Sequence, residues 1–463
     1  MSLIANLFRK KNLNDVLKKT PKSGLNKTLG AFDLILIGIG CTIGTGIFVI
    51  TGVASAKYAG PAIAISYAIA SLTCLFSALA YAELASMVPI SGSAYTYSYV
   101  IIGEFVAWLV GWGLILEYGI GASTVASGWS GYMVGIVKSA GINLPHFLTK
   151  TPFEGGIINL PAFLISCFIG LLLYRGTKES VALNRILVFI KLVVIFIFLI
   201  IATPLIQTQN YQDFMPFGFN GVMIGAATVF YAYIGFDAVA TTAEECKNPK
   251  RDLPIGIIAS LLICTVFYVA VALVLNGIVS FSTLDNSEPL AKALRDNGKN
   301  FGSALVATGA IAGITSVLLI LIYGQSRIFF VMSRDGLIPK IISKTHKKFN
   351  TPFVSVILTT CFVALISGLL PLETLSNMTS LGTLFGFIIV SIAVIILRIK
   401  QPNLQRSFKC PAVYFTASCA ILSCGYLVYK LLINNWHYFL AWTVIGIIFY
   451  FSYSFKNSEQ KKL

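Results

Sequence analysis

The chain has 463 residues, of which 56% are hydrophobic and only 11% charged, and its mean hydropathy is +0.82. This composition excludes an ordinary soluble globular protein, because apolar runs long enough to span a bilayer (about 18 residues or more) recur from Phe32 to Ser454. The net charge of +16 invites a nucleic-acid partner. However, most lysines and arginines fall on one side of the predicted spans. This asymmetry is typical of the charges that orient a membrane protein, so we expect no nucleic-acid partner.

The hydrophobic pattern predicts about twelve transmembrane helices in a lipid bilayer. They lie near residues 32–53, 61–86, 104–136, 158–175, 181–203, 221–243, 254–279, 302–333, 353–370, 375–397, 412–433 and 436–454. Because the positive charges collect on the side of residues 1–31, the positive-inside rule places both termini in the cytoplasm. We therefore expect a multi-pass protein of the cell (plasma) membrane, with cytoplasmic tails at 1–31 and 455–463.

The predicted spans fall into two five-helix units, 32–203 and 221–397. An odd number of helices per unit turns the second unit upside down relative to the first, as in the inverted repeats of secondary transporters. Two further helices occupy 412–454. The expected fold is thus an all-α integral membrane protein with a 5+5 inverted repeat plus two C-terminal helices.

Each unit opens with a hydrophobic segment that is interrupted at its centre. Glycines crowd residues 38–46 in the first segment, and Gly235 stands beside Asp237 in the second. Unpaired backbone groups in hydrocarbon cost several kcal/mol each, so broken helices persist only where they line a cavity. Two of them at corresponding places in two halves predict the central substrate site of a secondary transporter.

The chemistry of the two breaks fits an α-amino acid. The N–H groups at Gly44, Thr45 and Gly46 begin a half-helix and suit a carboxylate. The carbonyl groups near Thr42, and those exposed between Tyr231 and Gly235, suit an ammonium group. The alternative is that the glycines serve only close helix packing, since Gly40 and Gly44 have the spacing of a small-residue packing pair.

Four charged side chains lie within or near the spans. Asp237 either holds the substrate amine through water or caps the broken helix. Lys191 costs ~2.5–3.5 kcal/mol at mid-helix, so it either gains and loses a proton during transport or snorkels to the interface. Glu117 is deep enough to face the pathway, whereas Glu83 lies near the cytoplasmic end, where a solvated carboxylate is the simple alternative.

Other classes of function find little support. The nine cysteines are scattered and the three histidines lie near helix ends, so neither a disulfide framework nor a metal site is expected. No catalytic motif is present, and we expect neither an enzyme nor a cofactor. A channel would need a symmetric filter or charged ring, which two unlike halves do not provide. A membrane nutrient receptor that has the same fold but does not transport is an alternative that the sequence does not exclude. No sequence feature identifies a partner subunit.

Several motifs together resemble the amino acid–polyamine–organocation permeases, most closely bacterial members of the cationic amino acid transporter branch. They are Gly38–Phe48, Pro89–Tyr95, Phe230–Asp237 with Glu244-Glu245, Asn248-Pro249 and Pro254, and Ser333–Pro339. The resemblance implies the leucine-transporter-type fold and alternating access. It also implies that the substrate carboxylate binds at Ile43, Gly44, Thr45 and Gly46, and the amine at carbonyls of Thr42, Tyr231, Ala232 and Ile234.

The resemblance further implies that Lys191 replaces a sodium site and that transport is coupled to protons. The substrate itself is not settled by the branch name. Ser316 and Leu321 lie near the centre of the eighth span, where mostly bulky apolar residues leave little room for a cationic side chain to reach Glu117. We therefore expect small or medium neutral L-amino acids as substrates, with a cationic amino acid (arginine or lysine) carrier or an amino acid exchanger as the alternative.

Overall fold

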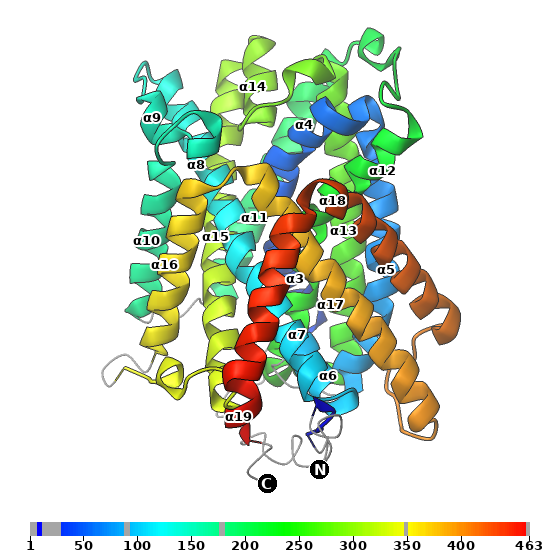
Figure 1. Cartoon of the computed structure of the whole chain (residues 1–463). Helices are drawn as coiled ribbons and strands as arrows, with labels where there is room; N and C mark the ends of the chain where they lie inside the picture. Colours follow the sequence, from blue (N-terminus) through cyan, green and yellow to red (C-terminus); the bar gives the residue numbers. More distant parts are fainter. Residues whose placement is uncertain (1–6, 12–28, 88–92, 176–180, 347–350, 460–463) are drawn as a thin grey trace.

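The computed structural model describes residues 7–11, 29–87, 93–175, 181–346 and 351–459. These residues form helices joined by turns, together with one isolated bridge between Leu29 and Cys246 (Figure 1). An all-α architecture is thus confirmed. Of the two predicted tails, 1–31 and 455–463, residues 1–6, 12–28 and 460–463 lie outside the described residues.

The α-helices are packed side by side in one bundle (Figure 1). In chain order they are α3 (Ala31–Thr42), α4 (Thr51–Ala54), α5 (Ile63–Met87), α6 (Ser93–Ile101), α7 (Glu104–Ile115), α8 (Gly121–Ser139), α9 (His146–Thr149), α10 (Leu160–Tyr174), α11 (Val181–Ala202), α12 (Gly218–Val229), α13 (Pro249–Ile278), α14 (Pro289–Asp296), α15 (Asn300–Arg334), α16 (Phe353–Leu369), α17 (Leu372–Lys400), α18 (Val413–Phe449) and α19 (Phe455–Asn457).

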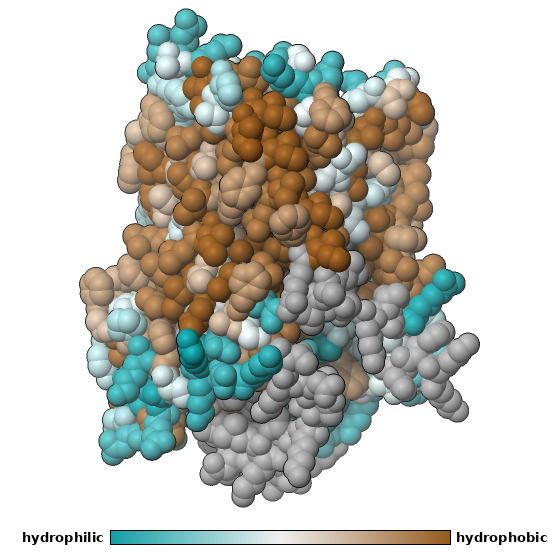
Figure 2. All heavy atoms as spheres, turned by 180° about the vertical axis from the view of Figure 1, so that it is seen from behind, coloured by the Kyte–Doolittle hydropathy of each residue, from teal (hydrophilic) through white to brown (hydrophobic). Residues whose placement is uncertain are grey.

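Eight helical stretches in the described part of the chain are long and apolar enough to cross a membrane. Three shorter apolar helices, α3, α10 and α16, accompany them. In Figure 2 an apolar belt covers the flank of the molecule, and hydrophilic side chains collect at its two ends. This distribution is that of a multi-pass membrane protein, whose lipid-facing side chains are apolar.

Helix α18 accounts for two of the predicted spans, although its helical backbone is continuous. In Figure 1 it rises from the lower right flank to the label α18 and then descends toward α19 and the C-terminus, and Tyr450, directly after it, donates to Glu104. Lys430, midway along it, donates to Asn220 at the opposite end. The helix therefore crosses the bundle and returns. The total of twelve spans and the inverted repeat remain predictions.

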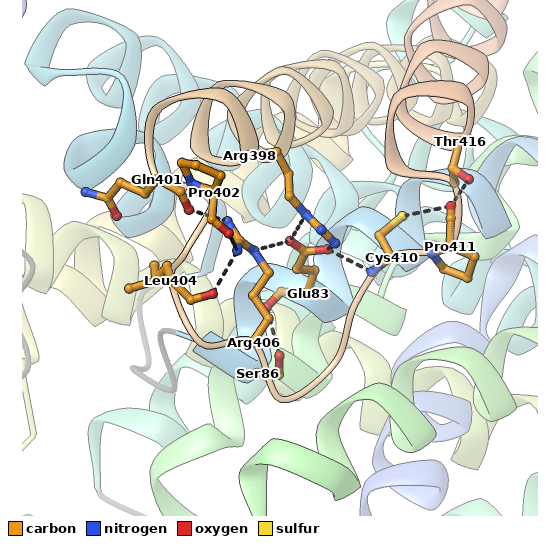
Figure 3. A network of polar contacts seen from close by, with 10 residues as sticks. All are labelled: Glu83, Ser86, Arg398, Gln401, Pro402, Leu404, Arg406, Cys410, Pro411 and Thr416. Carbon is orange, nitrogen blue, oxygen red and sulfur yellow. Dashed lines mark hydrogen bonds and ion pairs between the residues drawn. The ribbon is translucent and has the colours of Figure 1, made fainter.

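The buried carboxylate of Glu83 holds the linker that precedes α18 in place (Figure 3). Glu83, near the end of α5, is fully buried and accepts two bonds from Arg398, at 2.9 and 2.8 Å. It also accepts from Arg406 Nε at 3.0 Å and from the Cys410 backbone N–H at 2.7 Å. The alternative of a solvated Glu83 is therefore wrong. The carboxylate joins α5 to the end of α17 and to the linker before α18.

Both chain ends contribute to the same end of the bundle. Glu104 is buried and accepts from Arg9 at 3.1 Å, Tyr99 at 2.9 Å and Ser458 at 2.5 Å. Nearby, the carboxylate of Asp335, after α15, accepts from Lys11 and from Tyr95. Residues 7–11 are thus tied to α6, α7 and α15, which closes this end.

The opposite end is covered by α14 and its flanking loop. Pro289 packs so closely on Gly52 that an added Cβ at Gly52 would lie 2.5 Å from the Pro289 Cβ. Lys57 pairs with Glu373 at 2.7 Å and lies 3.7 Å from Asp285. These contacts join the α4 region, the loop before α14 and the start of α17, so the centre of the bundle is enclosed at both ends.

We expect Glu83→Ala to destabilise the protein strongly. Removing one partner of a buried ion pair costs about 3–5 kcal/mol, because the remaining charge stays buried without compensation. The melting temperature of the purified protein in detergent should fall by several degrees. Asp296→Asn is the control: it breaks the exposed Lys292–Asp296 pair, worth at most about 1 kcal/mol, and equal melting temperatures for the two variants would contradict a structural role for Glu83.

Candidate functional site

The first predicted break is present. Helix α3 ends at Thr42, Ile43 has an extended backbone (φ −76°, ψ 101°), and helical geometry resumes with a π-turn at Gly46–Ile50. The Thr51 hydroxyl donates to the carbonyl groups of Gly46 (3.2 Å) and Ile47 (2.9 Å), which supports the irregular turn. The first N–H groups of the resumed helix have no preceding turn to bond with.

The second predicted break is also present. Helix α12 ends at Val229 and continues as a 3₁₀ turn, Phe230–Tyr233, before the chain extends at Ile234 (φ −63°, ψ 132°). Gly235 then adopts φ +118°, and a second 3₁₀ stretch, Phe236–Glu245, follows. Glycine is required here because of this φ and because a Cβ would lie 2.9 Å from the Cys41 carbonyl.

The two breaks touch each other. An added Cβ at Gly46 would lie 2.5 Å from the Cα of Ala232, and the hydroxyls of Thr45 and Tyr231 are 3.0 Å apart. The Tyr268 hydroxyl on α13 lies within hydrogen-bond distance of the carbonyls of Thr42 (2.9 Å) and Ala232 (2.7 Å). Tyr268 therefore joins the two interrupted backbones, a role that no sequence motif indicated.

Lys191 attaches α11 to the first break. Its side chain is fully buried, and Nζ donates to the carbonyl of Gly40 at 2.7 Å. Its aliphatic part packs on Gly313 of α15. The ammonium group thus lies at the C-terminal end of α3, where a helix favours positive charge. The snorkelling alternative is wrong, since the lysine points into the bundle.

A small cavity opens where the breaks meet. The interrupted helices contribute one side of it, formed by Cys41, Thr42, Gly44, Thr45, Gly46, Tyr231 and Ile234. The other side comes from the π-turn Leu116–Ile120 and from α8, α15 and α17, with Glu117, Gly121, Val125, Val317, Leu321 and Thr379.

Most, but not all, predicted site residues line this cavity. Thr42, Gly44, Thr45, Gly46, Tyr231, Ile234, Glu117 and Leu321 do. Five others lie behind it: Ile43, Ala232, Asp237, Lys191 and Ser316. Ser316 is buried and its hydroxyl donates to the Gly313 carbonyl at 2.9 Å, so its proton is already engaged within α15.

The cavity offers unsatisfied polar groups next to an apolar wall. The hydroxyl oxygen of Thr42 is buried and has no hydrogen-bond partner among the described residues. Buried polar groups are normally paired, so this hydroxyl is available to a ligand. Val125, Val317 and Leu321 form the apolar wall. Sequence reasoning missed Gly121, Val125 and Thr379, because nothing in their local sequence separates them from other helical residues.

Two buried carboxyl groups meet at the cavity: Glu117, which lines it, and Asp237, which does not. The side chains of Glu117 and Asp237 interact with each other, and Asp237 also interacts with the backbone of residues 235, 237 and 238. Capping of the broken helix, one of the two interpretations of Asp237, agrees with this position. One of its carboxyl oxygens has no partner among the described residues.

Comparison with known proteins accords with this geometry. The model of the family described as "Amino acid permease" matches residues 29–451. The chain belongs to this family of amino acid–polyamine–organocation permeases. Its relatives are permeases and transporters, not enzymes.

Three relatives illustrate how names differ within the family. The chain is 46% identical to the branched-chain amino acid permease BcaP of Bacillus subtilis, over 98% of each chain. It is 44% identical to the methylthioribose transporter of the same species, over 99% of this chain and 100% of the relative. Identity to the vacuolar cationic amino acid transporter 4 of Arabidopsis thaliana is 37%, over 86% and 68% of the two chains.

We expect Gly46→Ala to force the two breaks apart, because its Cβ would overlap the backbone of Ala232. The variant should melt at a lower temperature in detergent. Gly425→Ala provides the matched control, since a Cβ at Gly425 meets nothing within 4 Å. If Gly46→Ala melted at the same temperature as the Gly425→Ala protein, the close contact between the breaks would be contradicted.

Proposed function

We propose that the protein is a secondary active transporter that takes up small or medium neutral L-amino acids together with protons, by alternating access. The observation that carries the proposal is the enclosed cavity at the meeting of two broken helices. It combines backbone N–H groups, backbone carbonyls and an apolar wall. These groups complement the carboxylate, the ammonium group and the apolar side chain of a neutral amino acid, respectively.

The substrate carboxylate binds at the start of the resumed helix, from Gly44 to Gly46. The first-turn N–H groups there lack backbone partners, and a helix N-terminus stabilises negative charge. The amine lies near the carbonyl ends of the opposite half-helices, at Thr42, Tyr231, Ala232 and Ile234. The Tyr268 hydroxyl occupies one acceptor position on the Thr42 and Ala232 carbonyls, and each carbonyl oxygen keeps a second lone pair for the amine.

The side chain of the substrate packs on Val125, Val317 and Leu321. Burial of an aliphatic chain against this wall favours neutral substrates, and BcaP, a relative along the full chain, is named for branched-chain amino acids. The specific alternative is a cationic amino acid, because Glu117 also lines the cavity and offers a carboxyl group. Leu321 and Val317 narrow the approach to it, which favours the neutral class.

Lys191 couples transport to protons. In the protonated state its ammonium holds the C-terminal end of α3 through the Gly40 carbonyl. Loss of the proton removes this charge-assisted bond, which is stronger than a neutral one, and releases α3 from α11. The neighbouring carboxyls of Glu117 and Asp237 provide a second group able to hold a proton.

The protein lies in the cell membrane, and the end of the bundle that carries the chain termini faces the cytoplasm. The lysines and arginines that collect on this side support the orientation through the positive-inside rule.

Uptake into proteoliposomes tests the proposal. We expect labelled alanine and leucine to accumulate when the outside is more acidic than the inside, and unlabelled arginine in tenfold excess to leave this uptake unchanged. A membrane receptor without transport would bind the label and accumulate none. Inhibition by arginine together with indifference to the gradient would instead support the cationic carrier or an exchanger.

Lys191→Ala should abolish gradient-driven accumulation and retain exchange of internal for external amino acid, because the site lies apart from the lysine. Lys191→Arg should give the same result, since arginine keeps its proton throughout the cycle. Lys138→Ala, at an exposed position at the end of α8, is the control and should accumulate normally. Accumulation at the wild-type level by Lys191→Ala would rule out proton coupling through this residue.

A further inference from the structure

The cavity has a polar end and an apolar end, and their separation can be followed along α15. Val317 lies at the polar end, because an added Cβ at Gly44 would meet it at 3.3 Å. Leu321, one helical turn (about 5.4 Å) further along α15, marks the apolar end. The side chain of a substrate whose carboxylate lies at Gly44–Gly46 therefore extends toward Leu321.

Two helices close this apolar end at one point. An added Cβ at Gly121 would lie 3.3 Å from the Thr379 methyl carbon and 3.7 Å from a terminal carbon of Leu321. Thr379 holds its hydroxyl to the Leu375 carbonyl at 2.9 Å, so its methyl group faces α8. Gly121 and Thr379 both line the cavity, and α8 and α17 are packed so closely here that an added Cβ would press on the Thr379 methyl group and the Leu321 side chain.

The backbone of α7–α8 explains why a glycine stands at this place. A π-turn, Leu116–Ile120, directly precedes Gly121, and such single-turn insertions are frequent at functional sites. The turn brings Glu117 and Gly121 to the same cavity. Glycine in a helix interior costs about 0.5–1 kcal/mol relative to alanine. No positive φ requires glycine at this position, so the close approach of the Thr379 methyl group and of Leu321 is what a larger residue would disturb.

We propose that Gly121, with the Thr379 methyl group opposite, sets the maximum size of the substrate side chain. The inference rests on the proposed function and deepens it: the site accepts branched aliphatic side chains because position 121 carries no Cβ. Alanine at this position fills the end of the side-chain subsite without changing the groups that bind the carboxylate and the amine. A serine at position 379 has the opposite effect, because it removes the methyl group and keeps the hydroxyl.

The test is a comparison of leucine and alanine uptake by proteoliposomes. For Gly121→Ala we expect the ratio of kcat/KM for leucine to that for alanine to fall about tenfold or more, the usual effect of one methyl group in an apolar pocket. For Thr379→Ser the ratio should stay level or rise. Gly386→Ala, on α17 like Thr379, is the matched control, since its Cβ would meet nothing within 4 Å.

The outcomes distinguish a failure of the proposed transport function from a failure of the size limit at Gly121. If the wild-type protein transports neither amino acid, the proposed function fails. If the wild type transports both and Gly121→Ala leaves the ratio unchanged, or lowers it no more than Gly386→Ala does, the size limit lies elsewhere and the inference is overturned. A smaller side-chain subsite lowers the leucine-to-alanine ratio, whereas misfolding lowers the uptake of both amino acids equally and leaves the ratio unchanged.

Discussion

Backbone polar groups inside a membrane must find partners within the protein, and the rest of this structure depends on how the chain meets that requirement at two interrupted helices. The carbonyls of Thr42 and Ala232 share the Tyr268 hydroxyl, that of Gly46 accepts from Thr51 and Tyr67, and that of Gly40 accepts from Lys191. The N–H groups at the start of the resumed helix and the Thr42 hydroxyl are left for a ligand. A bound amino acid would complete the set.

The sequence was sufficient to locate the breaks, because glycines and an acid in otherwise apolar segments conflict with a regular lipid-facing helix. For Lys191 it left two alternatives, an internal lysine and one that snorkels to the interface, and only the buried contact with the Gly40 carbonyl decides between them. Tyr268, Gly121 and Thr379 were not predicted. Each acts through a contact with a distant part of the chain, and an isolated tyrosine, glycine or threonine in a helix has no local pattern that reveals such a contact.

Glu83 and α18 show the same limit at the level of the fold. A carboxylate near a span end is compatible with solvent, and only the arrival of Arg398 and Arg406, more than 300 residues later in the chain, turns it into a buried anchor. The separation of residues 412–454 into two spans remains a prediction, although α18 bends back on itself in Figure 1. Their helical backbone nevertheless continues through the bend, because no proline or glycine interrupts residues 426–445.

Membership of the permease family indicates the fold of the protein but not its substrate. Two relatives of nearly equal identity carry the names of a branched-chain amino acid permease and a methylthioribose transporter. A shared fold therefore leaves specificity to a few side chains around the cavity. In this chain the break residues supply the polar end, and α8, α15 and α17 supply the apolar end, so changes in substrate can arise in the second set without disturbing the first.

The most direct test of the central claim is an experimental structure of the protein with bound leucine. The account predicts the carboxylate within hydrogen-bond distance of N–H groups at Gly44–Gly46, the amine toward the carbonyl ends of the two half-helices, and the side chain against Leu321. A ligand bound outside this cavity, or one with its carboxylate turned away from the resumed helix, would contradict it.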